Sequence, residues 1–169
     1  MLETKDLRLG KARFEDWQAM YRHVWSRRSS FRFMVLEPSP DEAEARERMR
    51  RTIAFQKERE TAYTIFLKST GEAIGFAGLE ELEPGVWGET GICLGPDFWG
   101  RGYGAQALDC LLALARERGA KVFCYASWEE NAASRALAAK AGFEPCGVEE
   151  HTRPYDGRAY RLIRYQKRL

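Results

Sequence analysis

The spacing of hydrophobic and polar residues changes several times along the chain, and each change marks the border between two predicted elements. An apolar run with polar interruptions over residues 2–9 predicts a first strand. Apolar side chains then recur at helical spacing over residues 14–24, which predicts an amphipathic helix. Residues 26–40, rich in Arg, Ser and Pro, read as a loop, and a charged helix is expected over residues 41–59.

Three strand-like segments follow in the middle of the chain, at residues 62–68, 73–82 and 86–94. The short connections between them contain Thr70-Gly71 and Pro84-Gly85, which are dipeptides typical of tight turns. Because strands joined by tight turns pair with each other, this part of the sequence predicts an antiparallel meander.

Helical and strand-like segments alternate in the rest of the chain. The predicted elements are a helix ending near residue 118, a strand at 121–127, an alanine-rich helix at 131–141 and final strands from 143 onward, including 160–165. A glycine follows each of the two helices, as is common at helix C-termini. The whole pattern predicts one α/β domain over residues 1–169, with helices flanking a mixed, mostly antiparallel sheet.

Three glycines crowd the turn where the helix after residue 94 begins: Gly100, Gly102 and Gly104. Backbone N–H groups at such a helix start approach an anion closely, so a phosphate-bearing cofactor is expected there. A Walker phosphate loop is excluded, because residues 104–106 read Gly-Ala-Gln and contain no Gly-Lys-Ser/Thr. The dinucleotide pattern G-x-G-x-x-A is met and remains a weaker alternative, since residues 95–99 separate the glycines from the preceding strand.

The composition narrows the class of protein. The chain has 27 basic and 25 acidic residues, so its net charge of +2 does not favour nucleic acid as a partner. No apolar run approaches the ~20 residues of a membrane span, and the first residues lack the apolar core of a signal peptide. Four dispersed cysteines are typical of a reducing cytoplasm, and two histidines without ligand spacing make a metal site unexpected.

The C-terminal segment is more basic than the rest of the chain. Residues 153–168 carry six basic side chains and only Asp156 against them. The segment reads either as a solvated last strand or as a cationic rim for cofactor phosphates or an acidic partner. A ribosome- or nucleic-acid-binding module that uses this segment is therefore one alternative function.

The glycine loop also resembles a known motif. Its sequence, Trp99-Gly100-Arg101-Gly102-Tyr103-Gly104, is similar to the pyrophosphate loop Arg/Gln-x-x-Gly-x-Gly/Ala of the GNAT acyltransferases. Trp stands in place of the usual Arg or Gln, as in the branch of ribosomal-protein N-terminal acetyltransferases (RimJ/RimL-like). Further similar stretches, in the order of the family, are 2–9, 89–94, N-x-x-S at 131–134, K-x-G-F at 140–143 and Asp-Gly at 156–157.

The resemblance implies an N-acetyltransferase that uses acetyl-CoA as co-substrate and needs no metal. It implies direct transfer to a primary amine in a ternary complex, where the amine belongs to a protein N-terminus or a small molecule. It is also compatible with a homodimer and implies no membrane partner. The residues expected to hold the cofactor are Ile92, Cys93, Leu94, Trp99, Gly100, Arg101, Gly102, Tyr103, Gly104, Ala105, Asn131, Ser134 and Lys140.

Acetyl transfer needs a neutral amine, donors for an oxyanion and a proton for the leaving thiolate. The resemblance makes Glu89 the first candidate for general base or substrate anchor and Ser134 the candidate proton donor. Trp87 shares a strand face with Glu89 and is expected to wall the acceptor pocket. Glu80, Glu81 and Glu83, on the neighbouring strand end, are weaker candidates for the base.

Two further alternatives stay open at this point. An acceptor with a low pKa, such as an α-amine, would need no general base at all, because an appreciable fraction of it is neutral near pH 7 to 8. The chain could also be a non-catalytic domain that binds or senses acyl-CoA. Such a domain would keep the glycine loop but would need neither Glu89 nor Ser134, and the presence of both favours the enzyme.

Overall fold

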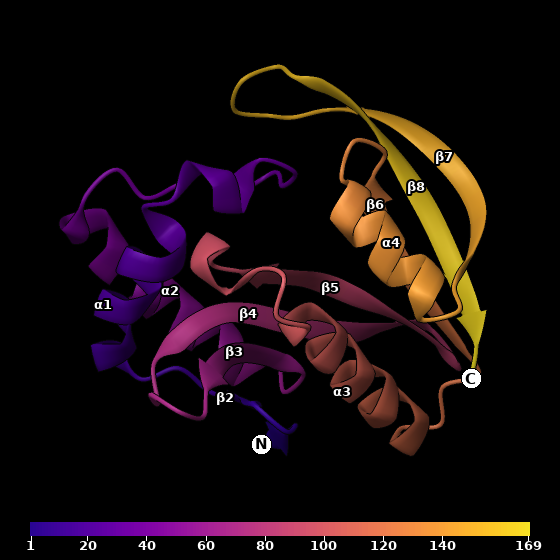
Figure 1. Ribbon diagram of the computed structural model, residues 1–169, viewed down its shortest axis with the longest axis horizontal. Coiled ribbons are helices and arrows are strands. Elements are labelled where there is room, and N and C mark those ends of the chain that lie inside the picture. The colour runs from indigo at the N-terminus through magenta and orange to yellow at the C-terminus, as the bar shows by residue number, and fades with distance from the viewer.

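The computed structural model describes all 169 residues, and Figure 1 shows a curved sheet with helices on both of its faces. Across the sheet the strands are ordered β1-β2-β3-β4-β5-β6-β8-β7. Every neighbouring pair is antiparallel except β5 and β6, which are parallel. This topology confirms the predicted α/β class with a mixed, mostly antiparallel sheet.

The observed bounds agree closely with the prediction from the second helix onward. The strands are β1 Leu2–Glu3, β2 Leu7–Gly10, β3 Ala62–Leu67, β4 Ala73–Glu83, β5 Val86–Leu94, β6 Val122–Trp128, β7 Glu144–Thr152 and β8 Ala159–Arg168. The α-helices are α1 Trp17–Met20, α2 Glu42–Glu58, α3 Tyr103–Glu117 and α4 Ala132–Lys140. None of the helices combines the length and the apolar composition needed to cross a membrane.

Two apolar clusters hold the helices on the sheet. The larger has 22 buried residues and lies under α3 and α4, where Leu108 and Leu111 pack with Ile65 and Ile74. The smaller has 11 buried residues, among them Met49 of α2, and lies under α1 and α2. Because successive strand residues point to opposite faces, β3 and β4 contribute to both clusters. The sheet therefore separates an α3–α4 face from an α1–α2 face.

The first strand is not continuous, contrary to the prediction for residues 2–9. The chain turns at residues 4–6, and β1 folds back to pair with β2. Thr4 stabilises the turn, because its hydroxyl oxygen accepts the N–H of Leu7 at 2.9 Å. That hydroxyl also donates to the side chain of Gln106 in α3 at 2.7 Å. The apolar pattern could not show this turn, since it depends on polar bonds to a helix far along the chain.

The predicted helix at 14–24 is present but irregular. It begins with a 3-10 turn at Phe14–Asp16, continues through α1 and ends in a π-helical turn at Tyr21–Trp25. The predicted loop at 26–40 contains one short 3-10 helix, Arg28–Phe31. This irregular stretch lies above the sheet on the α1–α2 face (Figure 1).

The parallel pair β5 and β6 separates soon after it forms. Pairing covers three residue pairs, from Val86 opposite Val122 to Gly88 opposite Cys124. Both strands continue beyond that point, β5 to Leu94 and β6 to Trp128, without pairing to each other. The result is a V-shaped opening in the middle of the sheet, with β5 on one arm and β6 on the other (Figure 1).

Candidate active site

The glycine loop connects β5 to α3. Gly100 and Gly102 have φ of +72° and +78°, in the left-handed region that glycine enters without steric cost. Gly102 is also the N-cap of α3. The indole N–H of Trp99 donates to the carbonyl of Leu94 at 2.8 Å and ties the loop to the end of β5. The local sequence thus fixes the loop without using its remaining N–H groups.

Those N–H groups form an anion cradle at the start of α3. None of the N–H groups of residues 100–105 donates a hydrogen bond within the protein, and the first to do so is Gln106, to the Gly102 carbonyl. A Cβ added at Gly100 or Gly102 would meet nothing within 4 Å, so the space in front of the loop is open. Six free donors at the positive end of a helix dipole suit a pyrophosphate.

The side chains that were expected to help bind the cofactor differ in their exposure and in their distance from the cradle. Arg101 is exposed beside it, whereas Tyr103 packs partly against the larger apolar cluster. Lys140 is in the last turn of α4, the length of that helix away from Asn131. The structure therefore brings Arg101 to the loop, but it does not place Lys140 beside Asn131.

Glu89 is at the point where β5 and β6 separate. Its Oε1 accepts the N–H of Ala126 in β6 at 3.1 Å. The carboxylate thus replaces the strand partner that this N–H lacks in the opening. Burial raises the pKa of the Glu89 carboxyl, and the N–H groups of Ala126 and Gly91 and the charge of Arg164 act in the opposite direction. A carboxyl with a raised pKa is a stronger base when it is ionised.

Ser134 is in the first turn of α4, the helix that follows β6. Its hydroxyl is 2.7 Å from the hydroxyl of Tyr125 in β6. Burial raises the pKa of Tyr125 to about 12, so this phenol stays protonated at neutral pH. The side chain of Asn131 accepts the N–H of Ser134 at 3.1 Å, which caps α4 and fixes the position of the serine.

The arm of β5 beyond Gly88 contains the expected oxyanion donors. On the side that faces β6 this arm has no neighbouring strand, so its peptide groups on that edge are available to a ligand. The side chain of Cys93 points to the α1–α2 face, where its thiol donates to the Ser30 carbonyl at 3.7 Å. Burial raises the pKa of this thiol to about 12, so it is no nucleophile at neutral pH. Ile92 and Leu94 point to the opposite face.

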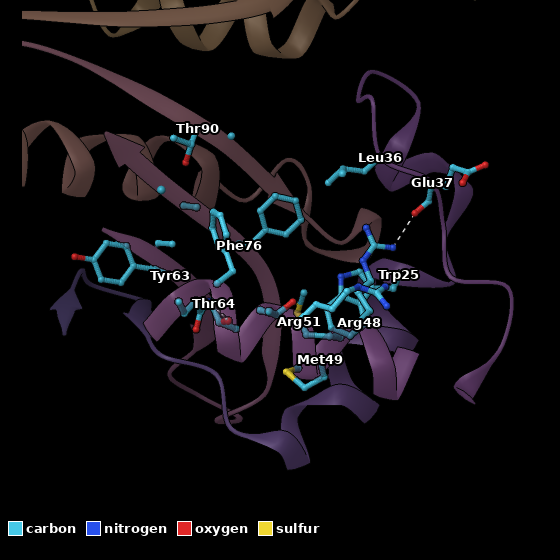
Figure 2. A pocket seen from close by; sticks show the side chains of 18 of the residues that line it. Trp25, Leu36, Glu37, Arg48, Met49, Arg51, Tyr63, Thr64, Phe76 and Thr90 are labelled. Atoms are coloured by element: carbon cyan, nitrogen blue, oxygen red, sulfur yellow. Dashed lines mark hydrogen bonds between the residues drawn. The ribbon is translucent and has the colours of Figure 1, made fainter. Parts of the chain in front are cut away.

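A cavity of about 690 Å³ opens on the α1–α2 face of the sheet (Figure 2). Its wall contains Thr90 and Gly91, the two residues that follow Glu89 in β5. The cavity is also lined by Trp25, Leu36, Glu37, Glu44, Arg48, Met49, Arg51 and Phe76. The volume is in the usual range for a small-molecule site. The cavity and the glycine loop therefore reach the opening from opposite faces.

Three residues that the sequence proposed for the acceptor site, Trp87, Glu80 and Glu81, do not line this cavity. Trp87 is buried in the larger cluster on the α3–α4 face, so it does not wall the pocket. Glu80 pairs with Arg59 at 3.1 Å, and Glu81 accepts the N–H of Gly85 at 3.1 Å. Both glutamates are exposed near the closed end of the β4–β5 hairpin. Among the candidate bases, Glu89 alone is at the opening.

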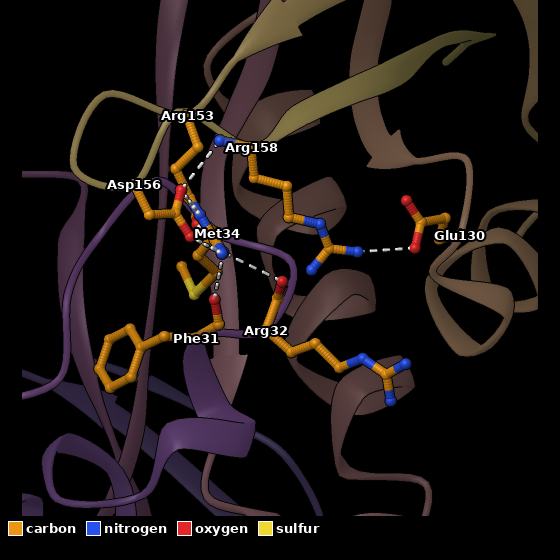
Figure 3. A network of polar contacts seen from close by, with 7 residues as sticks. All are labelled: Phe31, Arg32, Met34, Glu130, Arg153, Asp156 and Arg158. Carbon is orange, nitrogen blue, oxygen red and sulfur yellow. Dashed lines mark hydrogen bonds and ion pairs between the residues drawn. The ribbon is translucent and has the colours of Figure 1, made fainter.

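Arg153 connects the β7–β8 hairpin to the loop at 26–40 (Figure 3). It follows β7, is buried, and forms two hydrogen bonds with Asp156, at 2.9 and 2.6 Å. Its Nη1 donates to three carbonyls of the loop at 26–40, those of Phe31, Arg32 and Met34, at 3.2–3.4 Å. The β7–β8 hairpin thus holds the loop whose later residues wall the cavity.

Sequence reasoning missed Tyr125, Arg48 and Arg153. Tyr125 stands in an alternating strand pattern, where an aromatic residue is ordinary core. The two arginines stand among many others, and only their burial separates them from solvated charges. The basic segment at 153–168 could have given a signal for Arg153, because Arg153-x-x-Asp156 places opposite charges on either side of a turn.

The arrangement suits transfer between two bound molecules. An anionic carrier held at the glycine loop would enter the opening from the α3–α4 face. A second molecule in the cavity would reach the same point from the α1–α2 face. Between them stand a half-buried carboxyl at Glu89 and two hydrogen-bonded hydroxyls at Ser134 and Tyr125. No group of three or more His, Cys, Asp or Glu side chains is arranged to hold a metal ion.

Comparison with known proteins gives one family and a set of similar folds. A sequence model of the family described as "Acetyltransferase (GNAT) domain" matches residues 6–144. A ribosomal-protein-alanine N-acetyltransferase from Brucella melitensis is 22% identical, with a TM-score of 0.73 and coverage of 96% of this chain and 99% of that one. RimL, a ribosomal L7/L12 α-N-protein acetyltransferase solved with coenzyme A, is 21% identical, with a TM-score of 0.79 and coverages of 98% and 96%. The microcin C7 self-immunity acetyltransferase MccE, solved with acetyl-CoA and AMP, is 19% identical, with a TM-score of 0.81 and coverages of 98% and 94%.

Proposed function

Because the chain belongs to the GNAT acetyltransferase family, and is thus an acyl-CoA-dependent acetyltransferase, we propose that it transfers the acetyl group of acetyl-CoA directly to a primary amine. The reaction takes place in a ternary complex within one domain over residues 1–169. The observation that carries this proposal is the opening between β5 and β6, which the glycine loop reaches from one face and the cavity from the other.

On the donor side, the N–H groups of residues 100–105 bind the pyrophosphate of acetyl-CoA, and Arg101 adds charge beside them. The arm of the cofactor then runs along the free edge of β5 toward Gly88. Peptide groups on this edge hydrogen-bond the arm and bring the thioester next to Glu89. Asn131 contributes by holding the start of α4 in place.

On the acceptor side, Glu89 removes a proton from the ammonium group, directly or through one water. The neutral nitrogen then attacks the thioester carbon, and peptide N–H groups near Cys93 and Leu94 stabilise the oxygen as it gains negative charge. Glu89 suits this step because its carboxyl is enclosed, which raises its pKa, while it keeps a fixed orientation through Ala126.

Collapse of the addition product breaks the carbon–sulfur bond and leaves a thiolate on CoA. Ser134 donates its proton to that thiolate, and Tyr125 replaces the proton on Ser134 through their shared hydrogen bond. Solvent returns the proton to Tyr125 afterwards, while Glu89 releases the proton that it took from the amine. The nitrogen is positively charged after the attack and loses a second proton to solvent as the amide forms. The ammonium thus gives up two protons over one turnover, and the net result is one proton on the thiol of CoA and one in solvent.

The acceptor is a protein N-terminus or a small-molecule amine, and the cavity volume favours the small molecule. The test is a set of amines that includes short peptides, polyamines, amino acids and simple alkylamines, with CoA release followed by a thiol reagent. We expect release that depends on the amine and yields an N-acetyl product by mass spectrometry. A chain that binds acetyl-CoA but acetylates no member of this set contradicts the proposal.

A further inference from the structure

Arg48 is the one half-buried charged residue of the cavity wall that forms no ion pair, since Glu37, which also forms none, is exposed. The helix α2 contains four arginines, and three of them pair with a glutamate: Arg46 with Glu42, Arg50 with Glu47 and Arg51 with Glu44. Arg48 takes part in none of the ion pairs, although its side chain is half-buried in the cavity wall. A half-buried charge without a counter-ion is unfavourable for folding, so it is expected where a ligand uses it.

The contacts of Arg48 fix its guanidinium and leave one edge free. Its Nη1 donates to the Glu37 carbonyl at 2.7 Å and to the Ser39 hydroxyl at 3.3 Å. Its guanidinium carbon is 5.4 Å from the ring centre of Trp25 and 5.0 Å from that of Phe31. Nε and Nη2 have no partner in the protein, and neither is enclosed away from solvent. This Nε–Nη2 edge can bind both oxygens of a carboxylate or phosphate.

The other charges around the cavity do not satisfy this edge. The carboxyl whose charge acts on Arg48, that of Glu44, forms its ion pair with Arg51 on the same helix. Figure 2 shows the Glu37 carboxylate turned away from Arg48, which contacts the backbone of that residue. Burial lowers the pKa of Arg48, and the charges of Glu44 and Arg51 act on it in opposite directions.

Arg48 lies on the side of the cavity opposite to the reaction point. Figure 2 shows Thr90 and Arg48 on opposite sides of the cavity, with Phe76 between them. Glu89 directly precedes Thr90 in the chain, so the reacting amine belongs at the Thr90 side. A ligand that filled the cavity would therefore bring an amine to one end, an apolar middle against Phe76, and its opposite end to the guanidinium.

We propose that the acceptor is a small amine that also carries an anionic group, a carboxylate or a phosphate, and that Arg48 binds this group. The inference rests on the proposed acetyl transfer and names the class of its acceptor. Arg48 is then a specificity-determining residue, because a neutral amine of the same length leaves the guanidinium without its partner. Its contacts with Trp25, the Glu37 carbonyl and the Ser39 hydroxyl orient the fork before the ligand arrives.

The test compares acceptors in matched pairs: β-alanine with propylamine, γ-aminobutyrate with butylamine, aminohexanoate with hexylamine, and phosphoethanolamine with ethanolamine. The wild type should prefer the anionic member of at least one pair by about 10- to 100-fold in kcat/KM, as expected for a charged hydrogen-bonded pair. The first three pairs report a carboxylate and the last reports a phosphate. Equal rates within all four pairs overturn the inference while leaving acetyl transfer established.

Variants assign the preference to Arg48. Arg48→Gln should abolish it by lowering kcat/KM for the anionic amines about 10- to 100-fold and that for the neutral amines far less. Arg50→Gln, an exposed arginine of the same helix, should keep it. Ser39→Ala removes one contact of the loop with Arg48 but keeps the guanidinium, so it should also keep the preference. An Arg48→Gln variant that keeps the preference, or loses both members of a pair equally, overturns the inference.

Calorimetry gives a reading that does not depend on turnover. In the presence of CoA, the N-acetyl derivative of the preferred anionic amine should bind the wild type, and its affinity should fall about 10- to 100-fold in Arg48→Gln. If no amine releases CoA but this difference in binding is present, the proposed reaction fails and the anion site stands. If none of the N-acetylated anionic amines binds better to the wild type than to Arg48→Gln, the anion site fails.

Discussion

The pKa of the Glu89 carboxyl is subject to two opposite effects: burial disfavours the charged form, and two peptide N–H groups favour it. We expect Glu89→Gln to lower kcat by about 10²–10⁴, because the amide keeps the shape of the side chain but cannot take a proton. The loss should shrink as pH rises, since more of the acceptor is then neutral without help. Affinity for acetyl-CoA, measured by calorimetry, should barely change. Undiminished activity at all pH values would remove Glu89 from the mechanism.

Glu89→Gln, which should lower activity, should raise the stability of the protein relative to the wild type at high pH. The pKa of Glu89 is raised on folding, so the folded state holds this proton more tightly than the unfolded state does. Wild-type stability therefore falls as pH rises from the usual glutamate pKa through the raised one, and the glutamine variant lacks this loss. The Tm of Glu89→Gln minus that of the wild type should grow with pH and then level off. A difference that shrinks with rising pH would contradict the assignment.

Ser134 and Tyr125 share one hydrogen bond and should act as a unit. We expect Ser134→Ala to lower kcat clearly, because the thiolate loses its proton donor. Tyr125→Phe should have a smaller effect, since the tyrosine acts through the serine. The double variant should match Ser134→Ala alone, which a cycle of kcat values would show. Additive losses would mean that the two hydroxyls work separately.

The sequence identified Glu89, Asn131 and Ser134 through family-like motifs. Glu89 lies where β5 and β6 separate, and Asn131 and Ser134 lie at the start of α4, where Ser134 contacts Tyr125 of β6. Lys140, which the sequence also identified, is at the far end of α4.

The residues that the sequence missed have ordinary neighbours in sequence. Tyr125 is one aromatic residue of a strand, and Arg48 is one arginine of four in α2. Tyr125 differs from other strand aromatics because its hydroxyl contacts Ser134. Arg48 differs from the other arginines of α2 because no carboxylate pairs with it. Such facts arise only when distant segments meet.

The glycine loop offers a matched pair of changes within a single element. Gly102 has φ of +78°, so Gly102→Ala should destabilise the protein by about 1–2 kcal/mol and weaken acetyl-CoA binding. Gly104 is inside α3 with no positive φ, and a Cβ there would contact only Leu137, at 3.7 Å. Gly104→Ala should therefore be neutral or stabilise by up to about 1 kcal/mol. Urea unfolding and calorimetry measure both effects, and equal destabilisation by the two changes would be evidence against this loop geometry.

The β7–β8 hairpin acts on the cavity from a distance through Arg153. Arg153→Met keeps the apolar stem but removes the donors to the three loop carbonyls. We expect faster hydrogen exchange over the loop at 26–40 and a higher KM for the acceptor, with little change in the affinity for acetyl-CoA. Arg158→Met is the control, because Arg158 pairs with Glu130 and not with the loop. Unchanged exchange in Arg153→Met would contradict the proposed support.

Most elements could be predicted because their own sequences determine them: the turn glycines of the meander, the apolar face of α3 and the cap of α4. The N-terminal hairpin could not, since its turn depends on Gln106. Nor could the separation of β5 from β6. Both segments look like ordinary buried strands, and only their register shows where pairing ends.

For the whole molecule, bound acetyl-CoA should behave as a stabilising ligand. At about 100 times its dissociation constant it should add about 2.7 kcal/mol to the free energy of unfolding. We expect a clear rise in Tm with acetyl-CoA and none with NAD(P)H, which a thermal shift assay would measure. A rise with NAD(P)H alone would restore the dinucleotide interpretation of the glycine loop and overturn the assignment of the cofactor.

The opening between β5 and β6 is closed at both ends. At its narrow end the two strands pair, and at its wide end Arg153 joins the hairpin to the loop, where Phe33 and Trp128 also meet at 6.1 Å. The reaction point is thus inside a ring of protein, which the proposed acceptor would enter end-on from the cavity on the α1–α2 face. A slender molecule or the free tip of a chain passes through such a ring, whereas an amine in the middle of a folded surface does not. Selection among amines in a cell would then begin with their shape, before any charge is recognised.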